Sequence, residues 1–165
     1  MIQHHYYYPS KPCYDDLAPS YATFWQDEFI TIPLNEPFFF KFTGPTTPDI
    51  YLLDPSTIKV SKAGVYQVNY QVLLNVDANT NPSTLVSQRI SLYVNGIQQP
   101  NSQTSFGIEL IETQACFPIS GNFIVEIPAD ANLQLKNDGI YTGSSPITTC
   151  DNGVNSVSFS IIRID

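Results

Sequence analysis

The segment from Ala63 to Val76 alternates apolar and polar side chains, and this alternation constrains the fold more than any other feature. One face of the segment would carry Tyr66, Val68, Tyr70, Val72, Leu74 and Val76. The other face would carry Gln67, Asn69, Gln71 and Asn75, and only Leu73 breaks the pattern. Because successive side chains of a strand point to opposite faces, the pattern predicts a long, half-buried β-strand. The amide-rich face is uncharged, so it suits a polar interface as well as open water.

The chain has few charged residues. They make up 13% of its 165 residues, about half of the roughly 25% that is usual in soluble domains. Much of the surface must therefore be neutral, as in extracellular β-proteins and in subunits that bury their sides against copies of themselves. A monomer with a slightly adhesive surface is the alternative.

Charge and hydropathy exclude several classes of partner. The net charge is −8 and there are seven lysines and arginines, so we expect no nucleic-acid binding, which requires a basic patch. No apolar run approaches 18 residues, so we expect no membrane partner. The N-terminus lacks the cationic start and apolar core of a secretory signal peptide. Either a leader has been removed or the protein reaches its site without one.

The three cysteines, Cys13, Cys116 and Cys150, form no CxxC pair, so no zinc site is expected. An odd number of cysteines in an outwardly placed protein suggests an internal disulfide between Cys116 and Cys150. Cys13 would then remain for an intermolecular disulfide with a neighbour. Three reduced, partly buried thiols are the alternative.

Residues 1–25 differ from the rest of the chain. Pro9, Pro12 and Pro19 separate aromatic side chains there, and proline at this density favours extended conformations. Disordered tails usually avoid aromatic residues, so we predict a connector arm that docks on something, with a flexible leader as the alternative. Its aromatic residues are Tyr6, Tyr7, Tyr8, Tyr14, Tyr21, Phe24 and Trp25. His4 and His5 in this arm are taken as a chance pair rather than a metal site.

Residues 26–165 predict a single all-β domain of about ten strands. Short alternating or apolar runs recur between turn signals, and no window has a helical period. Asn95-Gly96 is a hairpin turn signal. Besides the segment at 63–76, the expected strands are 29–34, 38–42, 50–53, 57–62, 87–94, 97–102, 106–113, 116–127, 132–137 and 154–164. This spacing is typical of a sandwich or barrel.

The residues do not predict an enzyme. The only histidines are His4 and His5 in the arm, so neither a Ser-His-Asp nor a Cys-His site can be built within the domain. The carboxylate pairs lie in the arm or at expected strand edges. Loops at 43–49, 77–86 and 137–153 could form a binding rim, and Asp138, Asp151 and Asn152 could hold calcium, although oxygen-rich loops are commoner than calcium sites.

Four segments resemble one family, in order. Residues 58–70, Ile-Lys-Val-Ser-Lys-Ala-Gly-Val-Tyr-Gln-Val-Asn-Tyr, resemble a marker strand of the tumour necrosis factor and complement globular-head superfamily. Residues 91–96 resemble its hairpin, residues 157–164 its last strand, and residues 121–135 the segment between them. Within residues 121–135, Ala131 and Asn132 replace a Gly-Asp pair of the family. Among members of this family, the chain is most similar to the proteins of bacterial spore surfaces.

The resemblance implies a ten-strand jelly-roll β-sandwich that assembles as a homotrimer. By motif position, Tyr66, Tyr70 and Phe159 are candidates for packing in the core or at the trimer axis. The collagen-like stalk found in exosporium heads is absent, and the aromatic arm stands in its place. Trimers joined head to tail through such arms would form filaments.

The expected function is therefore that of a structural, self-assembling subunit of an endospore appendage fibre or exosporium layer, without a cofactor. Its partners would be itself and other spore-surface proteins, and its location the spore surface. Cys13 would lock the arm covalently to its neighbour. A trimeric receptor-binding or carbohydrate-binding head is the alternative, and a viral or phage-like shell protein is a third possibility.

Overall fold

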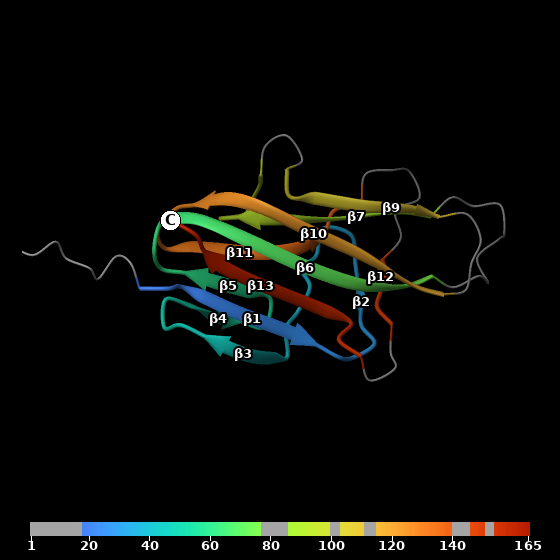
Figure 1. Ribbon diagram of the computed structural model, residues 1–165. Helices are drawn as coiled ribbons and strands as arrows, with labels where there is room; N and C mark the ends of the chain where they lie inside the picture. The colour runs from blue at the N-terminus through green and yellow to red at the C-terminus, as the bar shows by residue number, and fades with distance from the viewer. Residues whose placement is uncertain (1–17, 77–85, 100–102, 111–114, 140–145, 151–153) are drawn as a thin grey trace, which may run out of the picture.

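The computed structural model describes residues 18–76, 86–99, 103–110, 115–139, 146–150 and 154–165, and they contain thirteen strands and no helix. The strands pack as two antiparallel layers (Figure 1). Within this described part of the chain, no helix is long and apolar enough to cross a membrane. The prediction of an all-β fold is confirmed.

The first layer is a five-stranded sheet in the order β10-β6-β13-β1-β3. Its strands are β10 (Ala115–Ile127), β6 (Gly64–Val76), β13 (Val157–Arg163), β1 (Tyr21–Gln26) and β3 (Phe42–Thr46). The predicted strand at 63–76 is thus β6, and it lies between β10 and β13. Its two neighbours come from the distant second half of the chain, so β6 is a central strand of the fold.

The second layer contains β4 (Ile50–Asp54), β5 (Thr57–Val60), β11 (Ala131–Asn137), β7 (Val86–Val94), β8 (Ile97–Gln98) and β9 (Ser105–Leu110). Both β8 and β9 pair with β7, on different parts of its length. The turn between β7 and β8 is formed by Asn95 and Gly96, whose φ angles of 53° and 77° lie in the left-handed region. This is the conformation that the Asn-Gly pair predicts for a tight hairpin.

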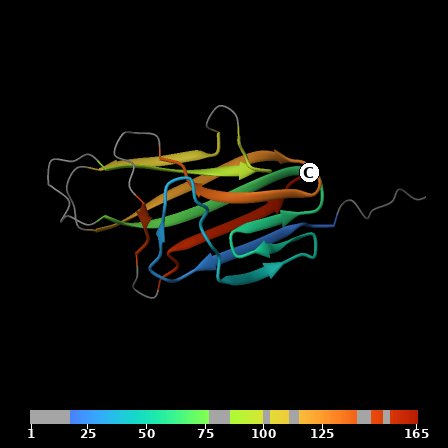
Figure 2. The same ribbon diagram turned by 180° about the vertical axis from the view of Figure 1, so that it is seen from behind.

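A small ribbon closes one end of the sandwich. It consists of β2 (Thr31–Ile32) and β12 (Ile147–Thr148), and it runs across the direction of the long strands (Figure 2). Ile32 and Ile147 in this ribbon are buried. The ribbon therefore covers apolar core that would otherwise face water.

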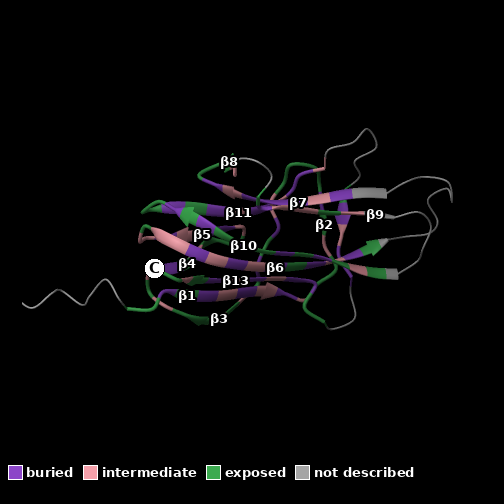
Figure 3. Cartoon of the chain, turned by 45° about the horizontal axis from the view of Figure 1, so that its top comes forward, coloured by how far each residue is buried: buried purple, intermediate pink, exposed green. Residues whose placement is uncertain are grey.

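The core lies between the two layers, and burial alternates along the strands (Figure 3). On β6 the even-numbered positions from Tyr66 to Leu74 are buried, as the period of two predicts. Gln67, Asn69, Gln71 and Asn75 point the other way and are partly or fully exposed. The amide residues therefore form an outer face of the first sheet, and the apolar residues fill the core.

Three strand predictions need correction, and the expected total of about ten is below the thirteen strands of the described residues. The strand expected at 29–34 is reduced to the two residues of β2. We assigned residues 21–25 to the connector arm, but they belong to β1, which pairs with β13 along its whole length. The arm therefore ends before Tyr21, and the domain includes β1. Residues 38–42 were expected to form a strand that stops at Thr43-Gly44-Pro45, whereas β3 begins at Phe42 and contains these three residues. An edge strand tolerates Gly and Pro in this way because one side of its backbone has no partner.

Candidate functional site

The outer face of the five-stranded sheet is the broadest candidate for a functional surface. Strand register aligns its side chains in three rows across β10, β6, β13 and β1. The rows are Ile124, Gln67, Ile162 and Tyr21; then Asn122, Asn69, Ser160 and Thr23; then Ser120, Gln71, Ser158 and Trp25. None of these twelve side chains is charged. We call this set the uncharged face.

The first row of the uncharged face is largely apolar. Ile124 is 52% exposed, Ile162 43% and Tyr21 38%. In the two other rows, amides and hydroxyls predominate, with weak side-chain contacts such as Gln71 Nε2 to Ser120 Oγ at 3.4 Å. A surface of this kind can be removed from water without leaving an ion unpaired.

The three residues proposed for core or axis packing all lie inside the sandwich. Tyr66 and Phe159 are completely buried and Tyr70 nearly so. The Tyr70 hydroxyl donates to the carbonyl oxygen of Ile90 at 2.9 Å, which joins the two layers. Burial raises the pKa of Tyr70 far above the usual value for tyrosine. These aromatic side chains are core residues of one subunit. The residues that alternate with them along the same strands point to the outer surface of the sheet.

The residues predicted for the connector arm divide into two groups. Tyr6, Tyr7, Tyr8, Cys13 and Tyr14 lie outside the described residues. Tyr21, Phe24 and Trp25 are in β1, where Phe24 is buried in the core. Trp25 stacks on Phe42 of β3 with ring centroids 5.6 Å apart. These three side chains are parts of the sheet rather than of an arm, because each is fixed by strand pairing.

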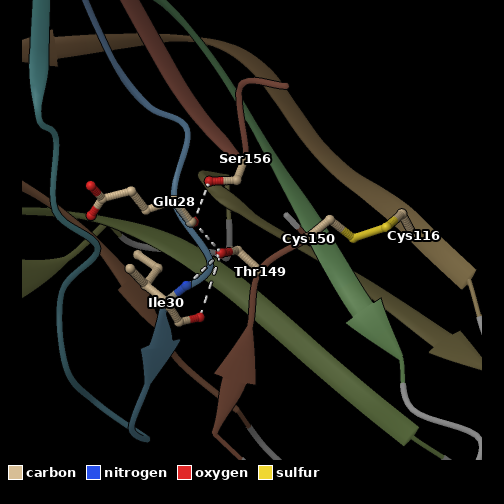
Figure 4. The surroundings of a disulfide bond; sticks show 6 residues. All are labelled: Glu28, Ile30, Cys116, Thr149, Cys150 and Ser156. Atoms are coloured by element: carbon tan, nitrogen blue, oxygen red, sulfur yellow. Dashed lines mark hydrogen bonds between the residues drawn. A yellow bond between two sulfur atoms is a disulfide. The ribbon is translucent and has the colours of Figure 1, made fainter. Parts of the chain in front are cut away.

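A disulfide joins Cys116 at the start of β10 to Cys150 just after β12 (Figure 4). This is the internal pair that we suggested, and not the alternative of three reduced thiols. Next to it, Thr149 Oγ1 donates to the carbonyl oxygen of Glu28 at 2.9 Å and accepts from the amide of Ile30 at 3.0 Å. Ser156 Oγ also donates to the Glu28 carbonyl, at 3.0 Å. The disulfide therefore lies beside a hydrogen-bonded junction that fixes residues 28–30.

A groove of about 390 Å³ lies beside this junction. Its walls are mainly apolar, and Phe39 in the groove is 44% exposed. Lys41 and Glu28 form an exposed ion pair at the groove. The complete lining is Gln26, Glu28, Ile30, Phe39, Phe40, Lys41 and Pro55. An aromatic surface next to a cation and an anion could bind a small ligand that has both apolar and hydroxyl groups.

The other polar cluster, on the second sheet, is an internal network. Arg89 Nη2 lies 2.7 Å from Asp138 Oδ2, and both side chains are mostly buried. Ser91 Oγ and Gln98 Nε2 each donate to the same carboxylate oxygen at 2.8 Å. Asp138, considered above as a calcium ligand, is thus held by an arginine and two neutral donors. Asp151 and Asn152, the other two residues considered as calcium ligands, lie outside the described residues.

In the described ranges, no group of three or more histidine, cysteine, aspartate or glutamate side chains could hold a metal ion. Both histidines of the chain are in residues 1–17, outside that part.

The structure resembles solved structures of globular heads. It matches the globular domain of a zebrafish complement 1qA protein with a TM-score of 0.61 and 9% identity, covering 88% of this chain and 98% of that one. It matches Eiger, a tumour necrosis factor from S. frugiperda, with a TM-score of 0.68 and 12% identity, covering 89% and 93% of the two chains. The chain has this jelly-roll head fold. No family model matches the sequence, and no curated protein matches it.

The similarity confirms the coarse part of the predicted resemblance, which is the fold shared by tumour necrosis factor and complement heads. At these identities the comparison establishes the fold alone. Function must be argued from the surfaces of this chain.

Proposed function

We propose that this protein is a non-enzymatic structural subunit that self-associates as a homotrimer through the uncharged face. The observation that carries the proposal is the set of three rows from Ile124 to Trp25, which cross four strands without a charged side chain. The chain as a whole has a net charge of −8, so an uncharged region of this extent is a distinct part of its surface.

Physical chemistry favours a second copy of this chain as the partner of that face. Burial of Ile124, Ile162 and Tyr21 removes apolar surface from water, at roughly 25 cal/mol per Å². Amide side chains such as Gln67 and Asn69 carry both donors and acceptors, so the same group can pair with its own copy across a symmetry axis. A closed ring of copies would shield this face from solvent.

We further propose that such trimers build a bacterial spore-surface fibre, of the endospore appendage kind, or an exosporium layer. The support is the resemblance of the sequence to spore-surface proteins and the composition of the N-terminal residues, where aromatic side chains alternate with prolines. Residues 1–17 would link one trimer to the next or to other spore-surface proteins, and Cys13 would make the link covalent.

Sedimentation of the purified full-length chain tests the self-association. For a homotrimer, sedimentation equilibrium should give a molar mass of about three times the 18.4 kDa of one chain. Filaments of such trimers should give a much larger mass. Electron microscopy of the full-length protein and of a form that lacks residues 1–17 tests the connector. Filaments that require residues 1–17 support the fibre, whereas a discrete trimer at every concentration contradicts it.

The groove beside Phe39 favours a second function, that of a carbohydrate-binding head. An exposed aromatic ring can stack on the apolar face of a sugar, while Lys41 and Glu28 can bond its hydroxyl groups. Saturable binding on a glycan array that is lost in Phe39→Ala would support this function. Phe29→Ala is the matched control, because Phe29 is 52% exposed and does not line the groove.

A further inference from the structure

The disulfide connects two parts of the molecule with different exposure. Cys116, at the start of β10, is exposed, whereas Cys150 is buried. Their Cα atoms are 6.0 Å apart and 34 positions separate them in sequence. A thiol in solution can therefore approach the bond from the Cys116 side, while the other half of the bond lies inside the end of the sandwich.

Backbone hydrogen bonds next to Cys150 hold two other segments. The Cys150 amide donates to the carbonyl oxygen of Leu73 on β6 at 2.9 Å, and the Thr149 amide donates to that of Ile30 at 2.9 Å. The Ile30 amide in turn donates to Thr149 Oγ1 at 3.0 Å. Residues 149–150 thus tie residue 30 to the central strand of the first sheet.

The segment fastened in this way forms one wall of the groove. Both Glu28 and Ile30 line the groove, and Thr149 bonds to the backbone of both (Figure 4). The groove lining also includes Lys41, whose side chain pairs with Glu28 and whose amide donates to the carbonyl oxygen of Trp25 at 3.0 Å. A chain of contacts therefore leads from the disulfide through Thr149 to the backbone of Glu28 and Ile30, whereas the backbone of Lys41 is held by a separate hydrogen bond.

Residues 147–150 are attached by a short ribbon, by a bridge from Thr149 to Leu74 and by the burial of Ile147 and Thr149. The ribbon that they enter pairs only two residues on each side, Ile147 with Ile32 and Thr148 with Thr31. So short a pairing contributes little stability on its own. The disulfide adds a covalent restraint one residue from Thr149, beside these noncovalent contacts.

We propose that the Cys116–Cys150 disulfide is a redox latch that fixes the Glu28–Ile30 wall of the groove. A dithiol reductant attacks the bond and is itself oxidised to a cyclic disulfide. Two electrons and two protons pass to the protein, and Cys116 and Cys150 become free thiols. In the reduced protein residues 149–150 separate more often from Leu73 and Ile30, and the wall opens while the two sheets stay folded.

Hydrogen exchange of backbone amides tests the latch in the full-length chain with Cys13→Ser, so that only Cys116 and Cys150 can react. The amides of Glu28, Ile30, Thr149 and Cys150 should exchange at least tenfold faster after reduction by dithiothreitol. The Lys41 amide, which is bonded to Trp25 and not to residues 149–150, is the internal control and should change less than twofold. Reoxidation should restore the original rates.

Two results would overturn the latch. In one, the four amides exchange equally fast in the oxidised and reduced protein. In the other, Lys41 accelerates as much as they do, which means that reduction unfolds the whole domain. Cys116→Ser in the Cys13→Ser background provides an independent measurement, since it should reproduce the exchange pattern of the reduced protein without reductant.

Discussion

The ring of Tyr70 occupies the space that a side chain at position 121 would need. Gly121 lies directly opposite Tyr70 in the pairing of β10 with β6, and a Cβ atom built on Gly121 would fall 2.6 Å from Tyr70 Cζ. The ring also makes edge contacts with Phe106 and Phe123, at centroid distances of 6.0 and 6.1 Å. The glycine therefore allows a large aromatic side chain to bridge the two layers.

The first prediction concerns this contact. Gly121→Ala should lower the free energy of unfolding by about 1–3 kcal/mol, the usual cost of overpacking a core. Chemical denaturation measures the change, and Ser120→Ala on the exposed neighbouring position is the control, with an expected effect below about 0.5 kcal/mol. Equal stability of the Gly121→Ala variant and the native protein would show that the Tyr70 ring can move aside.

The second prediction is the pH dependence that Tyr70 causes. Burial raises the pKa of Tyr70 in the folded protein, whereas unfolded tyrosine titrates near pH 10. Below pH 10 both states are protonated and this contribution to stability is complete. As pH rises above 10 the unfolded state loses its proton first, so the free energy of unfolding falls.

Tyr70→Phe removes this titration. The free energy of unfolding of Tyr70→Phe should therefore decline less steeply above pH 10 than that of the native protein, in urea denaturation series across this range. At pH 7 the variant should be less stable by about 1 kcal/mol, because it loses the hydrogen bond to Ile90. Parallel declines of the two proteins would contradict the assignment to Tyr70.

The third prediction concerns the ion pair between Arg89 and Asp138. Asp138→Asn leaves a mostly buried guanidinium without its carboxylate. Full burial of an unpaired charge costs about 3–5 kcal/mol, and the partial exposure of Arg89 reduces the expected loss to about 2 kcal/mol. Glu28→Gln, in the exposed pair with Lys41, is the control and should have a much smaller effect, because solvent screens that pair. A similar cost for both variants would contradict this ranking.

The fourth prediction concerns the disulfide and global stability. Because it closes a long loop, its reduction should lower the free energy of unfolding by about 2–4 kcal/mol. Thermal unfolding of the Cys13→Ser protein with and without dithiothreitol measures this. An unchanged unfolding temperature would mean that the bond restrains neither the folded nor the unfolded chain.

The predictions that succeeded depend on local pattern. The alternation from Tyr66 to Leu74 reports directly which side of β6 is buried, because the burial of neighbouring side chains follows the period of the strand. Asn95 and Gly96 likewise specify their turn through backbone conformations that few other residues adopt. Such features need no knowledge of distant residues.

The predictions that failed depend on distant partners. Residues 21–25 follow a proline-rich segment, which predicts that they belong to the arm, but their strand pairing is with residues 158–162. Ala22 and Phe24 are buried between exposed or partly exposed neighbours, but the sequence conceals this period of two because the outward positions 21 and 25 are aromatic. The ribbon of β2 and β12 has only two residues on each side, too few for any periodicity. Its position becomes apparent only after both sheets are in place.

In the candidate sites, too, local pattern predicts some residues, whereas others are brought together only by the fold. Local pattern revealed the amide residues of β6, and their neighbours Ile124 and Ile162 came into the same row only through strand register. The groove at Phe39 is lined by residues from separate places between Gln26 and Pro55, and Pro55 lies in the turn between β4 and β5. Its lining therefore could not be predicted without the fold.

The most direct test of the central claim, association through the uncharged face, is the molar mass of two matched arginine variants. Asn69→Arg places a charge in the middle row of that face, and Asn132→Arg places the same charge on an exposed position of the second sheet. With residues 1–17 removed from both, sedimentation equilibrium should give a single-chain mass for Asn69→Arg and a trimer mass for Asn132→Arg. A trimer mass for Asn69→Arg would contradict the claim.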